Sequence, residues 1–195
     1  MDDPEQAAAV VVVSSEEAPA DRPLERELLR VAVRAGEHAA GAVEVLSDDV
    51  GPSAEELPAR LQRSATRLFG EGASALLLIW PGVPRLRRDH LKAALGDLAA
   101  GCDLVLGPMI QGGFYLEALR EPHPELFELP GELWVSEDVM GFAEATRQSG
   151  LELGILQAER ALRSSADVRA ALADPLLPDE VRRALECVPD TRPSW

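Results

Sequence analysis

The sequence predicts an α/β fold built on a largely parallel sheet, and three observations support this. Short apolar runs rich in valine, leucine and isoleucine have the length of strands that are buried on both faces. Segments with apolar residues at helical spacing alternate with these runs along most of the chain. Alternation of this kind is typical of right-handed crossovers between parallel strands.

The first half of the chain repeats this unit regularly. We expect strands at residues 10–13, 42–46, 75–79 and 103–106, and helices at 24–35, 57–68 and 91–98. Gly36 supplies a stop for the first helix, Gly70 and Gly72 lie at the end of the second, and Gly101 ends the third.

The second half is less regular. The segment GPMIQGGFYLEAL resembles a turn that leads into a strand, and we expect a helix over 137–149 followed by a strand near 151–156. Ser164 and Asp167 have the spacing of a capping box, which predicts a short helix from there. Pro178 and the two acidic residues after it suit the first turn of a last helix.

Length and composition favour one compact domain. The chain has 195 residues, of which 46% are hydrophobic, enough for a single core. We therefore expect one domain over residues 1–195, with residues 1–6 flexible and 174–195 forming a C-terminal helical extension.

Charge and cysteine content narrow the partners and the compartment. With 19 basic and 34 acidic residues, the formal charge of -15 disfavours nucleic acid and membrane surfaces as partners. Cys102 and Cys187 lack disulfide-framework or zinc-site spacing, so we expect free thiols. The apolar run at 7–13 follows acidic residues and does not resemble a secretory signal, so a cytoplasmic protein is expected.

Ligands of open parallel sheets bind at the carboxyl ends of the strands, where four loops are expected to meet. These loops are residues 14–23, 80–86, 107–115 and 160–165. The third is the most informative, because Gly107, Gly112 and Gly113 allow positive φ angles and close approach of a ligand to the backbone.

Two segments carry a resemblance to a known family. LLLIWPGVPRLRRDHLKAAL and, shortly after it, DLVLGPMIQGGFYLEALREPHPELF resemble small bacterial glycosyltransferase-A-like transferases of the arsenosugar-biosynthesis type. That family is related to the phospholactate and molybdenum-cofactor guanylyltransferases. The resemblance is best over residues 57–168. It implies a Rossmann-like α/β/α sandwich, transfer of a sugar or nucleotidyl group from an activated nucleotide, and a divalent Mg or Mn ion.

The chain departs from this family where the metal ligands would be. Gly82 stands in place of the aspartate of Gly-Ser-Asp-x-Pro, and Gln111 in place of that of Asp-Gly-Gly-Tyr-Tyr-Leu. In the family segment Arg-Asp-Ile-Asp-Thr-x-x-Asp-Leu, aligned from Arg160 to Val168, the first two aspartates become Ala161 and Arg163. The family therefore leads us to expect Mg or Mn, but this chain lacks the matching ligands, and we assign it no metal ligand and no cofactor.

The N-terminal family loop Gly-x-x-Lys-Thr-Arg-Leu also differs. An ungapped register places Glu25 and Glu27 where its basic residues belong, so that this loop would repel a phosphate. Because a diphosphate leaving group needs a metal or cationic clamp, we predict a transferase-like protein whose activity is reduced, altered or lost. Arg163 can also act as a cationic substitute for the metal.

Two alternatives stay open. One is a non-catalytic interaction or regulatory protein that keeps the scaffold and pairs with a protein partner. The other is an active transferase that uses another acid, for which Asp48, Asp49, Asp103 and Glu117 are the candidates. The three histidines, His38, His90 and His123, show no catalytic spacing and are expected on the surface.

The predicted partner is a nucleotide or sugar nucleotide, and no residue is assigned as catalytic. Trp80 is expected to pack against or cap the altered pocket. The predicted substrate-binding residues combine the end of the first strand, the glycine turn and positions that match family segments: Ser14, Arg60, Gly107, Pro108, Gln111, Gly112, Gly113, Tyr115, Trp134 and Ser136.

Overall fold

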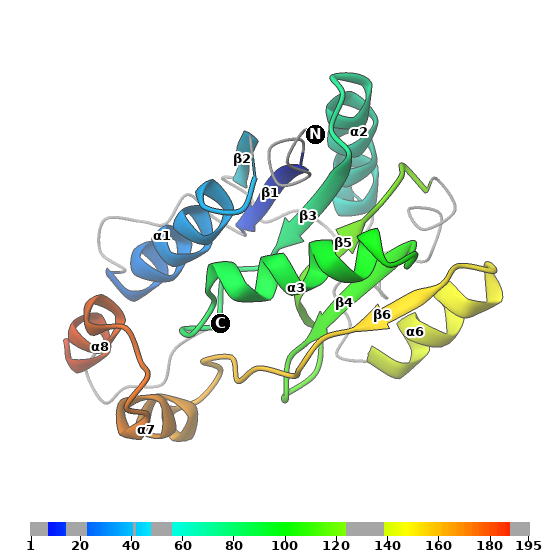
Figure 1. Cartoon of the computed structure of the whole chain (residues 1–195). Coiled ribbons are helices and arrows are strands. Elements are labelled where there is room, and N and C mark those ends of the chain that lie inside the picture. Colours follow the sequence, from blue (N-terminus) through cyan, green and yellow to red (C-terminus); the bar gives the residue numbers. More distant parts are fainter. Residues whose placement is uncertain (1–7, 15–22, 41, 48–55, 124–138, 188–195) are drawn as a thin grey trace.

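A computed structural model describes residues 8–14, 23–40, 42–47, 56–123 and 139–187. These residues form a six-stranded sheet with the strand order β2-β1-β3-β5-β4-β6 (Figure 1). The strands are β1 (Ala8–Ser14), β2 (Ala42–Ser47), β3 (Ala75–Ile79), β4 (Leu104–Pro108), β5 (Phe114–Leu119) and β6 (Leu153–Ile155).

Strand directions confirm the largely parallel sheet, with one exception. β1 runs parallel to β2 and β3, and β4 runs parallel to β6. β5 is antiparallel to both of its neighbours, β3 and β4. The short turn between β4 and β5 leaves no room for a crossover helix, so the chain can only turn back as a hairpin.

Helices cover both faces of the sheet, as the three-layer prediction requires (Figure 1). α1 (Pro23–Glu37) and α3 (Arg88–Ala99) pack on one face, where their apolar residues share a core with Val10, Leu77 and Tyr115. α2 (Glu56–Gly70) and α6 (Val139–Gln148) pack on the other face, against Val11 and Leu78.

Gly36 does not end the first helix, contrary to the prediction. α1 continues to Glu37. Gly36 instead lies where the helix passes close to β1. A Cβ atom at this position would lie 2.9 Å from Cγ1 of Val10. Gly72 and Gly101 do follow α2 and α3 with φ angles of 100° and 117°, which is the left-handed conformation that favours glycine after a helix.

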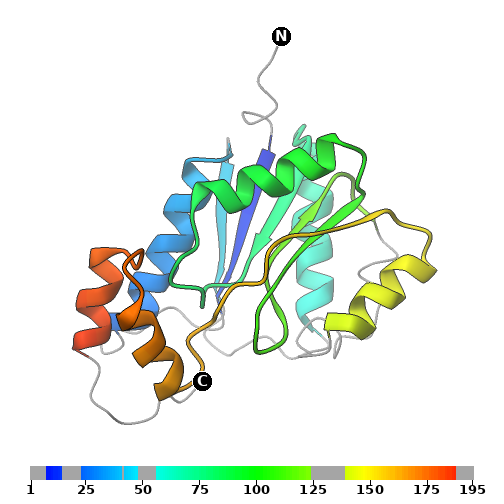
Figure 2. The same ribbon diagram turned by 60° about the horizontal axis from the view of Figure 1, so that its bottom comes forward.

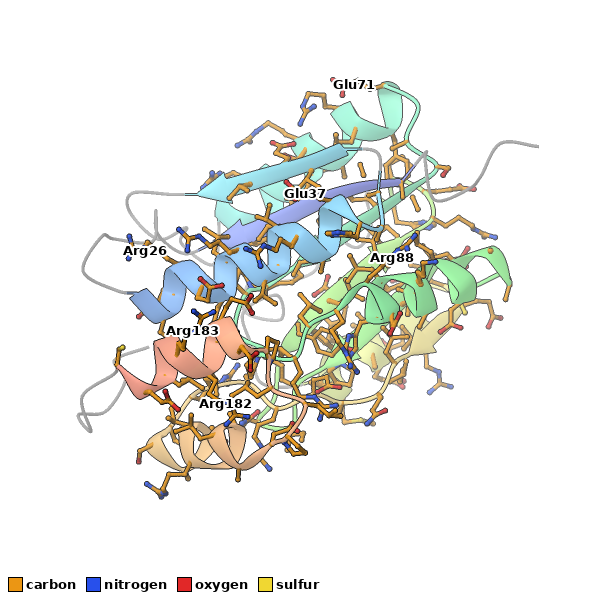
Figure 3. All side chains as sticks on the ribbon, turned by 60° about the vertical axis from the view of Figure 1, so that its left-hand side comes forward. Arg26, Glu37, Glu71, Arg88, Arg182 and Arg183 are labelled. Atoms are coloured by element: carbon orange, nitrogen blue, oxygen red, sulfur yellow. The ribbon has the colours of Figure 1, made fainter. Side chains whose placement is uncertain are left out.

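The C-terminal helices form a small core of their own with α1. α7 (Ser165–Ala173) begins as predicted: the Ser164 hydroxyl accepts a hydrogen bond from the Asp167 backbone N–H at 3.2 Å. α8 (Asp179–Glu186) packs against α1 and α7, and Val181 is fully buried among them. Figure 3 labels Arg182 on α8, whose guanidinium donates to the Leu172 and Asp174 carbonyls at the end of α7.

Within the ranges that the structure describes, no helix is long and apolar enough to cross a membrane.

Candidate functional site

The carboxyl ends of the five strands that run in one direction lie at one edge of the sheet, and β5 starts there. In Figure 2 this edge is at the bottom, where the β4–β5 turn and α7 lie. Three segments at this edge, residues 80–86, 107–115 and 157–164, are named the edge loops below. Four backbone hydrogen bonds join them: Trp80 N to Tyr115 O (3.1 Å), Ile110 N to Glu159 O (2.9 Å), Glu159 N to Pro108 O (3.0 Å) and Leu162 N to Gly82 O (3.1 Å).

Two of the three glycines in the β4–β5 turn have the predicted conformation. Gly112 and Gly113 have φ angles of 94° and 73°. Gly107 does not have a positive φ angle, and its reason is packing instead: a Cβ there would lie 2.6 Å from Cζ of Tyr115. The turn is therefore shaped by the buried Tyr115 ring on one side and by left-handed glycines on the other.

The Gln111 side chain uses both of its polar atoms inside the protein. Its Nε2 donates to the Ala161 carbonyl at 2.8 Å and to Oδ1 of Asp167 at 2.9 Å. Its Oε1 accepts from the Ala161 backbone N–H at 3.1 Å. Gln111 thus fastens the β4–β5 turn to the loop that precedes α7.

Asp167 is buried at the centre of this arrangement. Besides Gln111, its Oδ1 accepts from Arg160 Nη1 at 3.0 Å, and its Oδ2 accepts from the Ser164 hydroxyl at 2.7 Å and the Arg163 N–H at 3.3 Å. Burial opposes ionisation, but these hydrogen bonds outweigh it and lower the pKa of Asp167. Gln111, Arg160, Arg163, Ser164 and Asp167 are named the Gln111–Asp167 cluster below.

Arg163 extends the cluster to the glycine turn. Its Nη2 donates to the Gly112 carbonyl at 3.1 Å. The side chain therefore lies beside the turn, at the position where the family resemblance places an aspartate.

The residues around Gln111 do not fit the divalent metal that the resemblance implies. A carboxylate offers about four lone-pair directions, and four donors already occupy those of Asp167. Gln111 has its carbonyl oxygen engaged, and Gly82 brings no side chain. Across the described parts of the chain, no group of three histidine, cysteine, aspartate or glutamate residues could hold a metal ion.

His90 is not a surface residue, contrary to the expectation. Its Nδ1 accepts from the Arg87 N–H at 3.1 Å, so Nε2 carries the proton and donates to Oε1 of Glu159 at 3.1 Å. Its ring packs edge-on against Tyr115, whose hydroxyl donates to the Gln157 carbonyl at 3.2 Å. Burial and the charge of Glu159 raise the pKa of Tyr115. The contacts of His90 with Glu159 and Tyr115 hold α3 against the edge loop at residues 157–164.

The structure does not gather all of the predicted binding residues in one place. Ser14 ends β1 in register with Ser47, and Pro108 ends β4, both at the carboxyl edge. Arg60 is half-buried in α2, in the helix layer on the other side of the sheet from α3. Trp134 and Ser136 lie outside the described residues, as do the candidate acids Asp48 and Asp49.

Glu25 and Glu27 are placed differently from the expectation of a phosphate-repelling loop. Both belong to α1, because helical spacing of the apolar residues extends the helix back to Pro23. Glu27 is buried and pairs with Arg30 at 3.1 Å, which balances its charge. The loop before α1 lies outside the described residues.

The role of Asp167 was missed from the sequence, where it is expected only as part of a helix cap. One signal for it exists: Asp167 stands at the last aspartate of the family segment that begins at Arg160. It is the acid of that segment which this chain keeps.

Comparison with known proteins agrees with the fold. Residues 39–129 match the model of a family described as an uncharacterized protein conserved in bacteria (DUF2064). The chain is similar to the crystal structure of a candidate nucleotide-diphospho-sugar transferase from Desulfovibrio desulfuricans G20, with a TM-score of 0.75, 16% identity, and coverage of 93% of this chain and 94% of that one.

A weaker similarity links the chain to a cytidylyltransferase from Leptospira borgpetersenii, with a TM-score of 0.49, 8% identity, and coverage of 93% and 92%. No curated protein matches the sequence. The first structural neighbour confirms the predicted fold: this chain has the α/β fold of that nucleotide-diphospho-sugar transferase structure.

Proposed function

We propose that this protein binds a nucleotide or sugar nucleotide at the edge loops, and that metal-dependent group transfer is reduced or lost. The observation that carries this proposal is the Gln111–Asp167 cluster. Its hydrogen bonds close the place where the resemblance implies a cation, and they leave the buried carboxylate of Asp167 without a free lone pair.

Positive charge for a diphosphate is still present at this edge. Arg160 and Arg163 enter from the last edge loop, and Arg163 reaches the glycine turn through the Gly112 carbonyl. Guanidinium groups bind phosphate oxygens through charge-assisted hydrogen bonds, and unlike a metal they need no carboxylate ligands. A nucleotide held in this way would be bound without assistance from Mg²⁺ or Mn²⁺.

Group transfer needs stronger stabilisation of negative charge than binding does. Stabilising the charge on a departing diphosphate normally takes a metal or a cationic clamp aimed at the leaving oxygens. In this chain Arg160 pairs with Asp167, so less of its positive charge is available to stabilise a leaving group. The proposed binding surface keeps the glycine turn at its centre, with Ser14, Trp134 and Ser136 as further predicted contacts.

Titration calorimetry with sugar nucleotides of uracil, guanine and cytosine tests the proposal, once in EDTA and once in Mg²⁺. We expect binding to at least one of them with the same Kd in both buffers. Arg163→Gln should weaken binding about tenfold, since a charge-assisted hydrogen bond contributes roughly 1.5–3 kcal/mol. Arg169→Gln is the matched control, because Arg169 is exposed on α7.

The outcomes separate the alternatives. Binding that requires Mg²⁺ would contradict the metal-independent site. A lack of binding to all of the sugar nucleotides would favour a non-catalytic interaction protein that retains the scaffold.

A further inference from the structure

A cavity of about 230 Å³ lies beside the edge loops, between them and the two C-terminal helices. Charged side chains of both signs line it, Arg85 and Arg160 with Glu159 and Asp174. Ile110, which is 58% exposed, and Leu177 contribute apolar surface. The cavity shares Arg160 with the proposed nucleotide site, but neither that site nor the sequence resemblance assigns a role to Arg85, Asp174 or Leu177.

The two guanidinium groups are incompletely used by the protein. A guanidinium has five N–H donors. In the described contacts, Arg85 spends one nitrogen on Asp174 (Nη1 to Oδ2, 3.0 Å), and its Nε is buried without an acceptor. Arg160 likewise spends one nitrogen on Asp167 and stays 47% exposed. Apart from the buried Nε, each guanidinium therefore keeps N–H donors beyond the one ion pair described for it.

The acidic groups of the cavity are already engaged. Oε1 of Glu159 accepts from His90, and Asp174 accepts from Arg85 with Oδ2 and from the Leu176 N–H with Oδ1 (2.9 Å). Asp174 is also fixed in place, because Arg182 of α8 holds its carbonyl at 2.8 Å. Three of the four carboxylate oxygens of Glu159 and Asp174 therefore already accept a hydrogen bond inside the protein.

We propose that this cavity binds a small organic oxyanion, a carboxylate or a phosphate monoester with a short apolar part. Its oxygens accept from Arg85 and Arg160, and its apolar part lies against Ile110. A volume of about 230 Å³ suits a ligand smaller than a nucleotide, since pockets for drug-sized ligands are about 300 Å³ or larger. This site shares Arg160 and the edge loops with the proposed nucleotide site, but Asp174, at the end of α7, belongs to the cavity alone, so its variant tests this site separately.

Two variants with opposite expected effects test the proposal in the full chain. The ligands are butyrate and propyl phosphate, titrated by calorimetry at constant ionic strength. Arg85→Gln removes a charged donor and should weaken binding about tenfold or more. Asp174→Asn keeps the Oδ1 acceptor for the Leu176 N–H but removes the charge that competes for Arg85, so binding should tighten severalfold.

The pair of variants separates binding from stability. Both substitutions remove the same ion pair, so a merely structural role would move both in one direction. Opposite shifts in Kd for either ligand support the site, and the ligand that shows them identifies the carboxylate or the phosphate source. Absence of saturable binding by the wild-type protein, or equal Kd values in the three proteins, would overturn it.

Discussion

The amide of Gln111 donates where a carboxylate could only accept, and this difference decides the chemistry of the edge loops. Its Nε2 lies 2.9 Å from Oδ1 of Asp167, a distance at which two carboxylates repel each other. Gln111→Glu is therefore expected to lower the free energy of unfolding at pH 7.5 by about 3 kcal/mol, because an unpaired charge meets a buried one. Chemical denaturation at pH 7.5 and pH 5 measures it.

The loss should shrink at pH 5, since one carboxyl of the new pair can then hold a proton. Added Mg²⁺ should restore part of the stability of the Gln111→Glu variant while leaving the wild-type protein unchanged. An equally stable variant would mean that Gln111 does not hold the edge loops together. Gln148→Glu, on the exposed side of α6, is the matched control.

Glu117 should make the free energy of unfolding depend on pH. Its carboxyl is buried in the middle of β5, next to Leu78 and Leu106, and neither of its oxygens has a hydrogen-bond partner in the described structure. Burial raises the pKa of Glu117 from 4.5 to about 8. The folded protein thus holds a proton that the unfolded chain releases above pH 4.5.

Proton binding by Glu117 determines whether stability rises or falls with pH. Between pH 4.5 and about 8 the unfolded state binds fewer protons, so the free energy of unfolding falls as pH rises, by on the order of 1 kcal/mol per pH unit for this group. Glu117→Leu should remove this slope and raise stability at pH 7. Denaturant unfolding of both proteins from pH 5 to 8 measures it, and parallel pH profiles would show that Glu117 does not titrate as described.

At the scale of an element, close contact between α1 and β1 depends on Gly36. Gly36→Ala places a methyl group 2.9 Å from Cγ1 of Val10, whose side chain is fully buried and cannot move away. We expect a loss of about 1–3 kcal/mol in the free energy of unfolding. Gly96→Ala in α3 is the control: nothing lies within 4 Å of its new Cβ, so helix propensity should stabilise it by about 0.5–1 kcal/mol. Equal effects of the two substitutions would contradict the tight packing.

The elements themselves were largely predictable because their signals are local. Five of the strands and the helices around them follow from apolar spacing, and the Ser164 cap follows from two residues three apart. What failed depended on contacts between distant segments. Gly36 is explained by Val10, Gly107 by Tyr115, and the direction of β5 by the shortness of its turn.

The site was predictable in position but not in its connections. Gln111 could be recognised as a replaced aspartate, yet its partners lie 50 and 56 residues away in the sequence. Spacing carries no information on such pairs. For the same reason His90, which meets Glu159 69 residues further on, was expected on the surface.

For the whole molecule, the three cores are expected to unfold together. α8 closes the smallest core against α1, which itself packs on the central sheet. Val181→Ala, at a fully buried position of α8, should therefore lower the Tm of the entire protein by roughly 5 °C, given a cost of about 2 kcal/mol. Calorimetry with far-UV circular dichroism measures it. An early separate transition would show that the C-terminal helices are a detachable extension.

Net charge acts at this scale too. With a formal net charge of -15, the protein repels anions on average. A phosphate or carboxylate ligand is therefore expected to bind at the arginines of the edge loops. Binding of such ligands should accordingly be confined to this edge.

If the Gln111–Asp167 cluster replaces a catalytic metal, turnover cannot depend on one. The test is the release of nucleoside diphosphate from sugar nucleotides, followed over a titration from EDTA to millimolar Mg²⁺ or Mn²⁺. We expect a rate that does not change with metal. A robust rate that rises with metal and saturates would show that the edge loops hold a metal site after all.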